Sequence, residues 1–285
     1  MAPFYELLNL ESPQDVLNLH ADYLDAGAEI ITTNSFSAHP YSLKEWGYDE
    51  QAFKINHQAA KLARKAIDES GKKAWIAGSL GPTAASLTLC SGDTDFKRMK
   101  DGYKLQAKAL LDGGADFLLI ETIHDPLNAK TAWIGILELI DEENYKTEIA
   151  LSLTVELTGA SLSGQSIASF VVSTTHLNPL FLGLNCSLGP QSLYHPVTEL
   201  SRLSPYPVSL APNAGLPDER GKYILEPKLF TEQMRKFLEK GYLNVLGGCC
   251  GTTPEHIREL GKMIKSFKPR DTRGSVEGYI AGLDA

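Results

Sequence analysis

The stretch Asp116-Phe-Leu-Leu-Ile-Glu-Thr-Ile123 leads, after a short turn, into the amphipathic segment Leu127–Asp141. The first stretch is a nearly continuous apolar run, which is typical of a parallel strand covered on both faces. The second repeats apolar residues at the spacing of a helix with one buried side. A strand followed directly by a helix is the repeating unit of a parallel α/β fold.

The same unit recurs along the whole chain. Six further strands are expected at Ala28–Phe36, Ala74–Leu80, Ile149–Val155, Leu180–Cys186, Pro207–Pro212 and Asn244–Cys249. Seven further helices are expected at Gln14–Ala26, Asp49–Glu69, Phe96–Asp112, Ile167–His176, Gln191–Leu203, Pro227–Lys240 and Pro254–Ser266. Repeats in this number favour a (β/α)₈ TIM-type barrel. A doubly wound sheet is the alternative, but no Gly-x-Gly-x-x-Gly sequence follows an early strand.

The number of strands is one short of a closed barrel. An eighth strand would have to precede Gln14, where Phe4-Tyr-Glu-Leu-Leu8 is a poor candidate. We therefore expect a barrel domain over residues 1–267 that lacks its first strand. Residues 268–285 are polar and contain glycine, so they are expected to form a tail or the beginning of a linker.

Composition excludes several classes of partner. The net charge of −8 is spread along the 285 residues without a basic cluster, which argues against nucleic acid and anionic membranes. No apolar run approaches the ~20 residues of a membrane span, and the N-terminus lacks the regions of a signal peptide. Four cysteines in such a chain fit reduced thiols in the cytoplasm better than a disulfide framework.

Three cysteines stand where apolar runs give way to turns. Cys186 lies in Gly183-Leu-Asn-Cys-Ser187, and Cys249 and Cys250 lie in Gly247-Gly-Cys-Cys-Gly-Thr-Thr-Pro254. Active sites of such barrels form at the carboxyl ends of the strands, so these thiols can converge there. Three thiolates would make a zinc site with one open position, which is typical of a catalytic metal. A fourth ligand that is itself a thiol would lose its proton on binding.

The alternative for these three cysteines is that each is a small buried apolar residue. The remaining cysteine, Cys90, lies in a polar loop with no second ligand spaced near it, and is expected to be a spare thiol. His39 and His124, both near strand ends, are expected to be solvent or loop residues. A thiol that loses its proton on binding the metal needs no histidine as a general base.

Seven motifs carry a family resemblance. They are Ala26-Gly-Ala-Glu-Ile-Ile-Thr-Thr-Asn-Ser-Phe36, Gly78-Ser-Leu-Gly-Pro-Thr83, Gly114-Ala-Asp-Phe-Leu-Leu-Ile-Glu-Thr122, Leu162-Ser-Gly-Gln165, Gly183-Leu-Asn-Cys-Ser-Leu-Gly-Pro190, Pro212-Asn-Ala-Gly-Leu-Pro217 and Gly247-Gly-Cys-Cys-Gly-Thr-Thr-Pro254. With these motifs the chain resembles the homocysteine S-methyltransferase family, and most closely the homocysteine-binding module of cobalamin-dependent methionine synthase. The two cysteine motifs are the specific ones.

The resemblance implies zinc-dependent methyl transfer to the thiol of homocysteine, forming methionine. It implies that the three cysteines Cys186, Cys249 and Cys250 hold Zn²⁺ and that the homocysteine thiol is the fourth ligand. It assigns Glu121 to the amino group of the substrate, which fits an acid at the active end of a barrel. More weakly, it places three further side chains in the substrate pocket, those of Asn185, Thr33 and Asn34.

The sequence departs from the family pattern at both ends. The family opens with an Asp-Gly-Gly-x-Gly-Thr segment that forms the first strand and contributes an aspartate to the substrate; this sequence has none. Either the native protein is longer, or the barrel is gapped and binds its substrate weakly. In methionine synthase, folate- and cobalamin-binding modules follow the barrel, so here cobalamin is expected on a separate module or protein.

The methyl donor is therefore expected to be methylcobalamin or methyltetrahydrofolate, acting through methionine synthase modules in trans. S-methylmethionine is the alternative donor. Two further hypotheses are a zinc- and homocysteine-binding fragment without turnover, and a purely structural zinc site.

Overall fold

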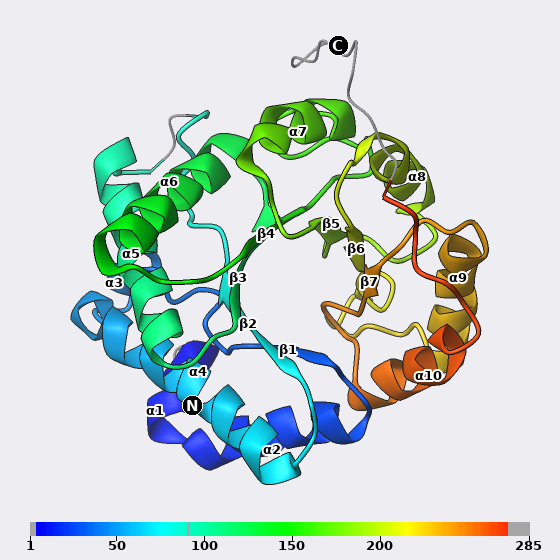
Figure 1. Ribbon diagram of the computed structural model, residues 1–285, viewed down its shortest axis with the longest axis horizontal. Helices are drawn as coiled ribbons and strands as arrows, with labels where there is room; N and C mark the ends of the chain where they lie inside the picture. The colour runs from blue at the N-terminus through cyan, green and yellow to red at the C-terminus, as the bar shows by residue number, and fades with distance from the viewer. Residues whose placement is uncertain (1–3, 90–91, 273–285) are drawn as a thin grey trace. The chain divides into compact units, whose positions relative to one another are not determined.

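The computed structural model describes residues 4–89 and 92–272. The chain folds as two compact units, Met1–Ile149 and Ala150–Ala285. In each unit, parallel strands follow one another in chain order and are separated by helices (Figure 1). The described residues contain seven strands, the number that the sequence predicts.

The first unit contains β1, β2 and β3 and begins with helical turns. Its elements are η1 (Tyr5–Leu7), α1 (Leu8–Glu11), α2 (Pro13–Asp25), β1 (Ile30–Thr32), α3 (Pro40–Lys44), η2 (Asp49–Gln51), α4 (Ala52–Ser70), β2 (Trp75–Leu80), α5 (Phe96–Asp112), β3 (Phe117–Ile123) and α6 (Pro126–Glu143). Pro13 occupies the first turn of α2 after Ser12, whose side chain makes no capping hydrogen bond.

An apolar cluster joins the first strands to the helices that cover them. Leu17 and Leu24 of α2 pack with Ile31 of β1 and Ile76 of β2. Ala63, Ala66 and Ile67 complete this cluster from α4. Burying a leucine or isoleucine side chain contributes roughly 1.5–3 kcal/mol, so this cluster holds β1 and β2 in the register Ile31↔Ile76.

The second unit carries the remaining strands. Its elements are β4 (Ile149–Leu153, starting at the last residue of the first unit), α7 (Ile167–Thr174), η3 (Thr175–Leu177), β5 (Leu182–Asn185), α8 (Tyr194–Leu203), β6 (Val208–Ala211), α9 (Pro227–Glu239), β7 (Val245–Leu246) and α10 (Pro254–Ile264). All residues of β4 and β5 are buried, as the continuous apolar runs predict.

Small residues form one row across these strands. Register places Ser152 beside Gly183, and Gly183 beside Ser209. A Cβ atom on Gly183 would lie 1.9 Å from Oγ of Ser209, so only glycine fits there. This close approach explains the glycine three residues before Cys186.

The structure describes part of both ends of the chain. Phe4–Leu8, the poor candidate for a strand, is a bend and helical turns rather than a strand. Of the predicted tail, residues 268–272 are described, and Arg270 is buried. Its guanidinium donates to the carbonyl oxygens of Ser201, in the last turn of α8, and Ser204, just after the helix, each at 2.6 Å. The predicted domain bounds, 1–267 and 268–285, stay predictions.

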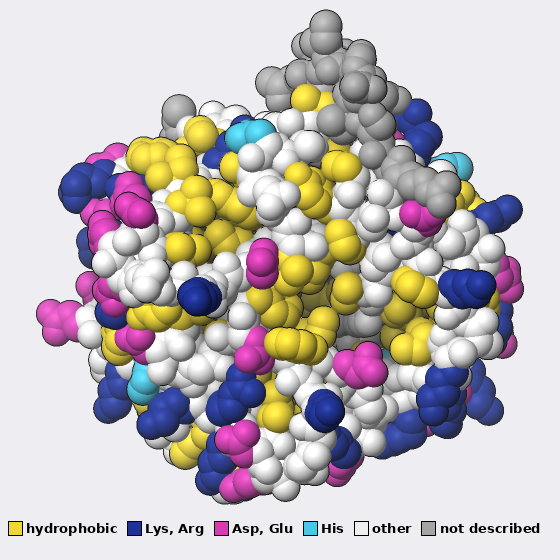
Figure 2. All heavy atoms as spheres, in the orientation of Figure 1, with side chains coloured by type: hydrophobic (Ala, Val, Ile, Leu, Met, Phe, Trp, Pro, Cys, Tyr) yellow, Lys and Arg dark blue, Asp and Glu magenta, His cyan; other side chains and the backbone are white. Residues whose placement is uncertain are grey.

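Charges of both signs are interspersed on the face of the molecule shown in Figure 2. Among the described residues, no helix has both the length and the apolar composition needed to cross a bilayer.

Candidate metal centre

Cys186, Cys249 and Cys250 converge in the second unit. Their three sulfur atoms all lie within 4.8 Å of one another. The sulfur of Cys250 is 3.7 Å from that of Cys186 and 4.0 Å from that of Cys249. All three are free thiols, two half-buried and Cys250 exposed. The structure therefore brings together the three residues that the sequence selects.

Backbone conformation at Cys186 turns its side chain out of the strand direction. Cys186 and Ser187 have φ angles of 64° and 57°, in the left-handed region that non-glycine residues rarely adopt. The Cys186 amide still donates to the carbonyl oxygen of Ala211 at 3.0 Å, which continues the pairing of β5 with β6. Left-handed residues of this kind cost of order 1–3 kcal/mol each and are common at functional sites.

The second cysteine loop is built by hydrogen bonds to its neighbour, the loop after β6. The Cys249 amide donates to the carbonyl oxygen of Pro212 at 2.8 Å, and the Cys250 amide donates to Oδ1 of Asn213 at 3.1 Å. Gly251 has a φ angle of +78°, which provides the turn that lets adjacent cysteines face one centre. Asn213 thus orders the two loops.

Electrostatics make the three thiols unfavourable neighbours when they are deprotonated together. Contacts with Cys186 and Cys249 lower the pKa of Cys250 to about 2, whereas its burial acts in the opposite direction. Contacts with Cys186 and Cys250, together with burial, raise the pKa of Cys249. One proton leaves easily and the others are retained, because like charges this close repel. A bound dication would remove that repulsion.

The sulfur positions fit a tetrahedral metal ion. Zn–S bonds of about 2.3 Å at tetrahedral angles place sulfur atoms about 3.8 Å apart. The separations of 3.7 and 4.0 Å come close to that value. A centre with three thiolate ligands suits zinc and leaves one position for a further ligand.

Two residues that sequence reasoning missed support this loop. Tyr223 hydrogen-bonds to Cys250, and burial followed by the charge of that thiolate raises the pKa of the phenol to about 12. Its side chain packs so closely on Gly251 that a Cβ there would lie 2.2 Å from Cβ of Tyr223. His256 caps α10 together with Thr253 and contacts the carbonyl oxygen of Leu225 at 2.9 Å through Nε2. Of this region the sequence predicted only that a helix begins at Pro254, which the structure confirms.

In the first unit, Thr33 and Glu121 are connected through Ser79, which sequence reasoning also missed. The Ser79 hydroxyl donates to Oε1 of Glu121 at 2.6 Å. The Ser79 amide donates to Oγ1 of Thr33 at 3.0 Å. Thr122, the next residue after Glu121, has a φ angle of 54°. Two predicted pocket residues therefore share one hydrogen-bonded cluster beside a strained strand end.

Asn34 and Asn185 are held by other partners. The side-chain Nδ2 of Asn34 donates to the carbonyl oxygen of Tyr5 at 2.9 Å and to Oδ1 of Asn9 at 3.1 Å, which ties the N-terminal turns to the loop after β1. Oδ1 of Asn185 accepts from the hydroxyl of Ser152 at 2.7 Å. These bonds give both residues a structural role; their predicted contact with substrate stays a prediction.

His39 lies in the loop before α3, as one of the two expected alternatives has it, but it is not exposed to solvent. His39 is only 1% exposed and caps α3, where its Nδ1 accepts from the amide of Tyr41 at 3.0 Å. Burial lowers its pKa to about 4. His124 is half-buried in the turn after β3. Cys90, the expected spare thiol, lies outside the described residues.

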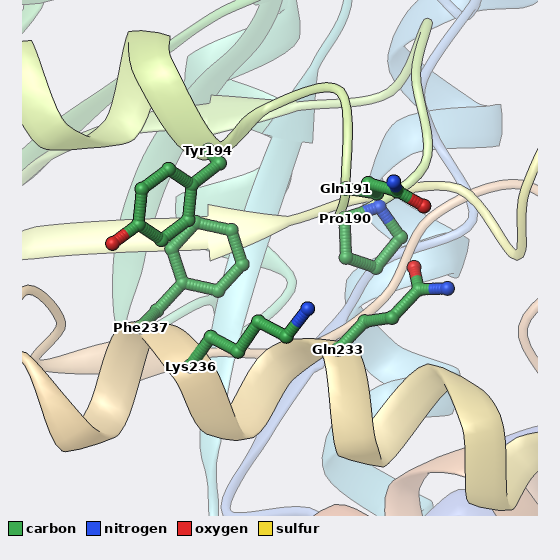
Figure 3. Close-up of a pocket in the computed structure, with 6 residues that line it drawn as sticks. All are labelled: Pro190, Gln191, Tyr194, Gln233, Lys236 and Phe237. Atoms are coloured by element: carbon green, nitrogen blue, oxygen red, sulfur yellow. The ribbon is translucent and has the colours of Figure 1, made fainter.

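A small cleft lies between the loop before α8 and helix α9 (Figure 3). The Tyr194 and Phe237 rings meet there, with centroids 5.5 Å apart, and Lys236 extends along one side. Its lining residues are Pro190, Gln191, Tyr194, Gln233, Lys236 and Phe237. None of them is a predicted site residue.

Comparisons with known proteins bear on the fold and the family of this chain. The chain is similar to the homocysteine methyltransferase MmuM from Escherichia coli in its metallated form, with 24% identity, a TM-score of 0.72, and coverage of 90% of this chain and 86% of that one. For the apo form the values are 22%, 0.69, 92% and 89%. An old yellow enzyme homologue from Zymomonas mobilis matches at 13% identity and a TM-score of 0.54, over 93% of this chain and 90% of that one.

These structural matches confirm the predicted TIM-type barrel fold. The family model described as homocysteine S-methyltransferase matches residues 4–264, which include both cysteine motifs and Glu121. The chain belongs to the homocysteine S-methyltransferase family.

Proposed function

We propose that this protein transfers a methyl group to the thiol of homocysteine, forming methionine, at a zinc centre on Cys186, Cys249 and Cys250. The convergence of the three sulfur atoms within 4.8 Å carries this proposal. A family whose substrate is a thiol, and a centre with a place for one more sulfur, support the same chemistry.

Each part of the chain has a defined task in this reaction. Bound zinc would supply the positive charge that deprotonates the homocysteine thiol at neutral pH. The three cysteines fix where the reacting sulfur lies, and Glu121 accepts hydrogen bonds from the substrate ammonium. No general base is needed, because the thiol proton has already left. The new S–CH₃ bond forms as the donor's bond to the methyl group breaks, and the donor keeps the electron pair.

For the methyl donor, we propose methylcobalamin or methyltetrahydrofolate presented by a separate methionine synthase module. The close resemblance of the cysteine motifs to the homocysteine module of that enzyme supports this donor. The three described cysteines are free, which fits a reducing compartment, so we expect the protein in the cytoplasm.

S-methylmethionine is the second candidate donor. It is favoured by one observation: the match to the E. coli homocysteine methyltransferase covers 86% of that chain, so a homocysteine methyltransferase of similar extent exists. A small sulfonium can reach the reacting sulfur without a partner protein.

The test is to incubate zinc-loaded protein with homocysteine and each donor in turn, and to measure methionine. Methionine from either donor supports methyl transfer and identifies the donor. Bound zinc and bound homocysteine without methionine from any donor would indicate the non-catalytic fragment instead. A zinc environment unchanged by homocysteine in X-ray absorption would indicate structural zinc.

A further inference from the structure

A cluster of hydrogen-bonded side chains supports Glu121 in the first unit. It comprises Thr33, Ser35, Ser79 and Glu121, and we call it the hydroxyl cluster. The three hydroxyl residues are 4%, 0% and 1% exposed, whereas Glu121 is half-buried. Glu121 is therefore the member that a ligand can reach, and the other three lie behind it.

The direction of every hydroxyl proton in this cluster follows from counting donors. A carbonyl oxygen only accepts, so the Ser35 hydroxyl donates its single proton to the carbonyl oxygen of Ser79 at 2.7 Å. Thr33 must then be the donor in its 2.6 Å contact with Ser35. A carboxylate also only accepts, so Ser79 donates to Glu121 at 2.6 Å.

All three hydroxyl protons are committed inside the cluster. The Thr33 oxygen, besides donating, also accepts from the Ser79 amide at 3.0 Å, so the two residues hold one another. The cluster consequently has no hydroxyl proton left to donate to a ligand. A carboxylate of a substrate gains nothing from it, whereas an ammonium group, which has three donors and no acceptor, is complementary to Glu121.

Register explains why Ser79 can reach Glu121. β2 pairs with β3 so that Ser79 lies opposite Leu119. Glu121 is two residues further along β3, so its side chain emerges on the same face as that of Leu119. A short bond to a charged acceptor restricts the carboxylate to one orientation.

We propose that Ser79 is a positioning residue for the Glu121 carboxylate, and that the hydroxyl cluster makes this position selective for a cationic group on the substrate. The inference rests on the proposed function, which supplies homocysteine as the ligand. Ser79 acts through Glu121, and Thr33 acts through Ser79.

The test compares two ligands by calorimetric titration of the zinc-loaded protein. The ligands are L-homocysteine and 4-sulfanylbutanoate, which lacks only the amino group. Ser79→Ala should weaken homocysteine binding about tenfold, which is the effect expected from losing one hydrogen bond to a charged group. It should leave 4-sulfanylbutanoate binding unchanged. Thr131→Val, which removes a buried hydroxyl bonded to the carbonyl oxygen of Leu127 in α6, should change neither.

A double variant separates positioning from a general loss of structure. If Ser79 acts through the carboxylate, Ser79→Ala should add nothing to the effect of Glu121→Gln. Equal weakening of both ligands, tighter homocysteine binding, or fully additive effects would overturn the inference while leaving the proposed function intact. If the unaltered protein binds neither ligand, the proposed function fails and the inference fails with it.

Discussion

The hydroxyl cluster of the first unit and the cysteine centre of the second unit satisfy their polar groups in opposite ways. In the hydroxyl cluster each hydroxyl proton has an acceptor within the chain, and the bonds to Glu121 and Ser35 are both 2.6 Å. In the cysteine centre three acidic groups lie within 4.8 Å of one another. No cationic side chain is among the interactions that shift their pKa values.

This difference separates a preformed site from one that needs a metal. The hydroxyl cluster keeps its geometry by its own hydrogen bonds, so a ligand meets an ordered carboxylate. The cysteine centre contains like charges at close range, which a dication would compensate. Backbone strain is shared by both: Thr122 has a φ angle of 54° and Cys186 one of 64°. Backbone strain therefore does not distinguish the hydroxyl cluster from the cysteine centre. The like charges in the cysteine centre do.

The largest expected effect comes from removing one sulfur. Cys249→Ala should abolish stoichiometric zinc binding and reduce methionine formation by more than about a thousandfold, because two thiolates cannot hold a catalytic zinc as three do. Metal analysis and a methionine assay measure the two losses, and Cys186→Ser should behave alike. Full activity in either variant would show that the cysteine centre does not carry the reaction.

Glu121→Gln should have the next largest effect and should leave zinc bound. Loss of a charge-assisted contact with the ammonium is expected to weaken homocysteine binding about a hundredfold. Calorimetry and metal analysis on the same preparation separate the two sites. A loss of zinc along with homocysteine would mean that Glu121 and the cysteine centre do not bind their ligands independently.

The cysteine centre could be predicted from the sequence, whereas the residues that support Glu121 and Cys250 could not. The cysteine centre was predictable because the cysteines stand where predicted strands give way to turns and glycines adjoin them, so the parallel fold brings the thiols to one edge. Ser79 was not predictable, because its contact with Glu121 depends on the register of β2 against β3. Tyr223 was missed because its position depends on the path of a loop, fixed by bonds such as that from the Leu225 amide to the carbonyl oxygen of Ala214 at 3.1 Å.

The burial of two histidines also could not be predicted from the sequence. His39 and His20 are buried because of how α3 and α2 pack, and nothing in the local pattern shows it. Burial lowers the pKa of each to about 4 from 6.5. Their folded forms therefore bind fewer protons than the unfolded chain between pH 6.5 and pH 4. Stability falls as the pH falls through that window.

His20→Leu should reduce this acid sensitivity. At pH 5 a pKa lowered from 6.5 to about 4 lowers the free energy of unfolding by about 2 kcal/mol relative to pH 7. Nε2 of His20 has no hydrogen-bond partner among the described residues, so leucine removes a titrating group without breaking a bond. Urea unfolding at the two pH values measures the difference. An equal loss in the variant and the unaltered protein would contradict the assignment.

Tyr223→Phe should have the smallest effect, and it acts on the cysteine centre alone. The phenol hydrogen-bonds to Cys250 and so stabilises the thiolate that a metal requires. Removing an outer hydrogen-bond partner of a ligand typically costs about tenfold or more in metal affinity. We expect the lower end of that range, because Cys250 is also exposed to water. Competition with a chromophoric chelator measures the zinc affinity. Ser79→Ala is the matched control, since Ser79 lies in the hydroxyl cluster and its loss should leave the zinc affinity unchanged. Equal loss of zinc affinity in both variants would contradict this prediction. The hydroxyl contacts would then stabilise the chain as a whole rather than each site separately.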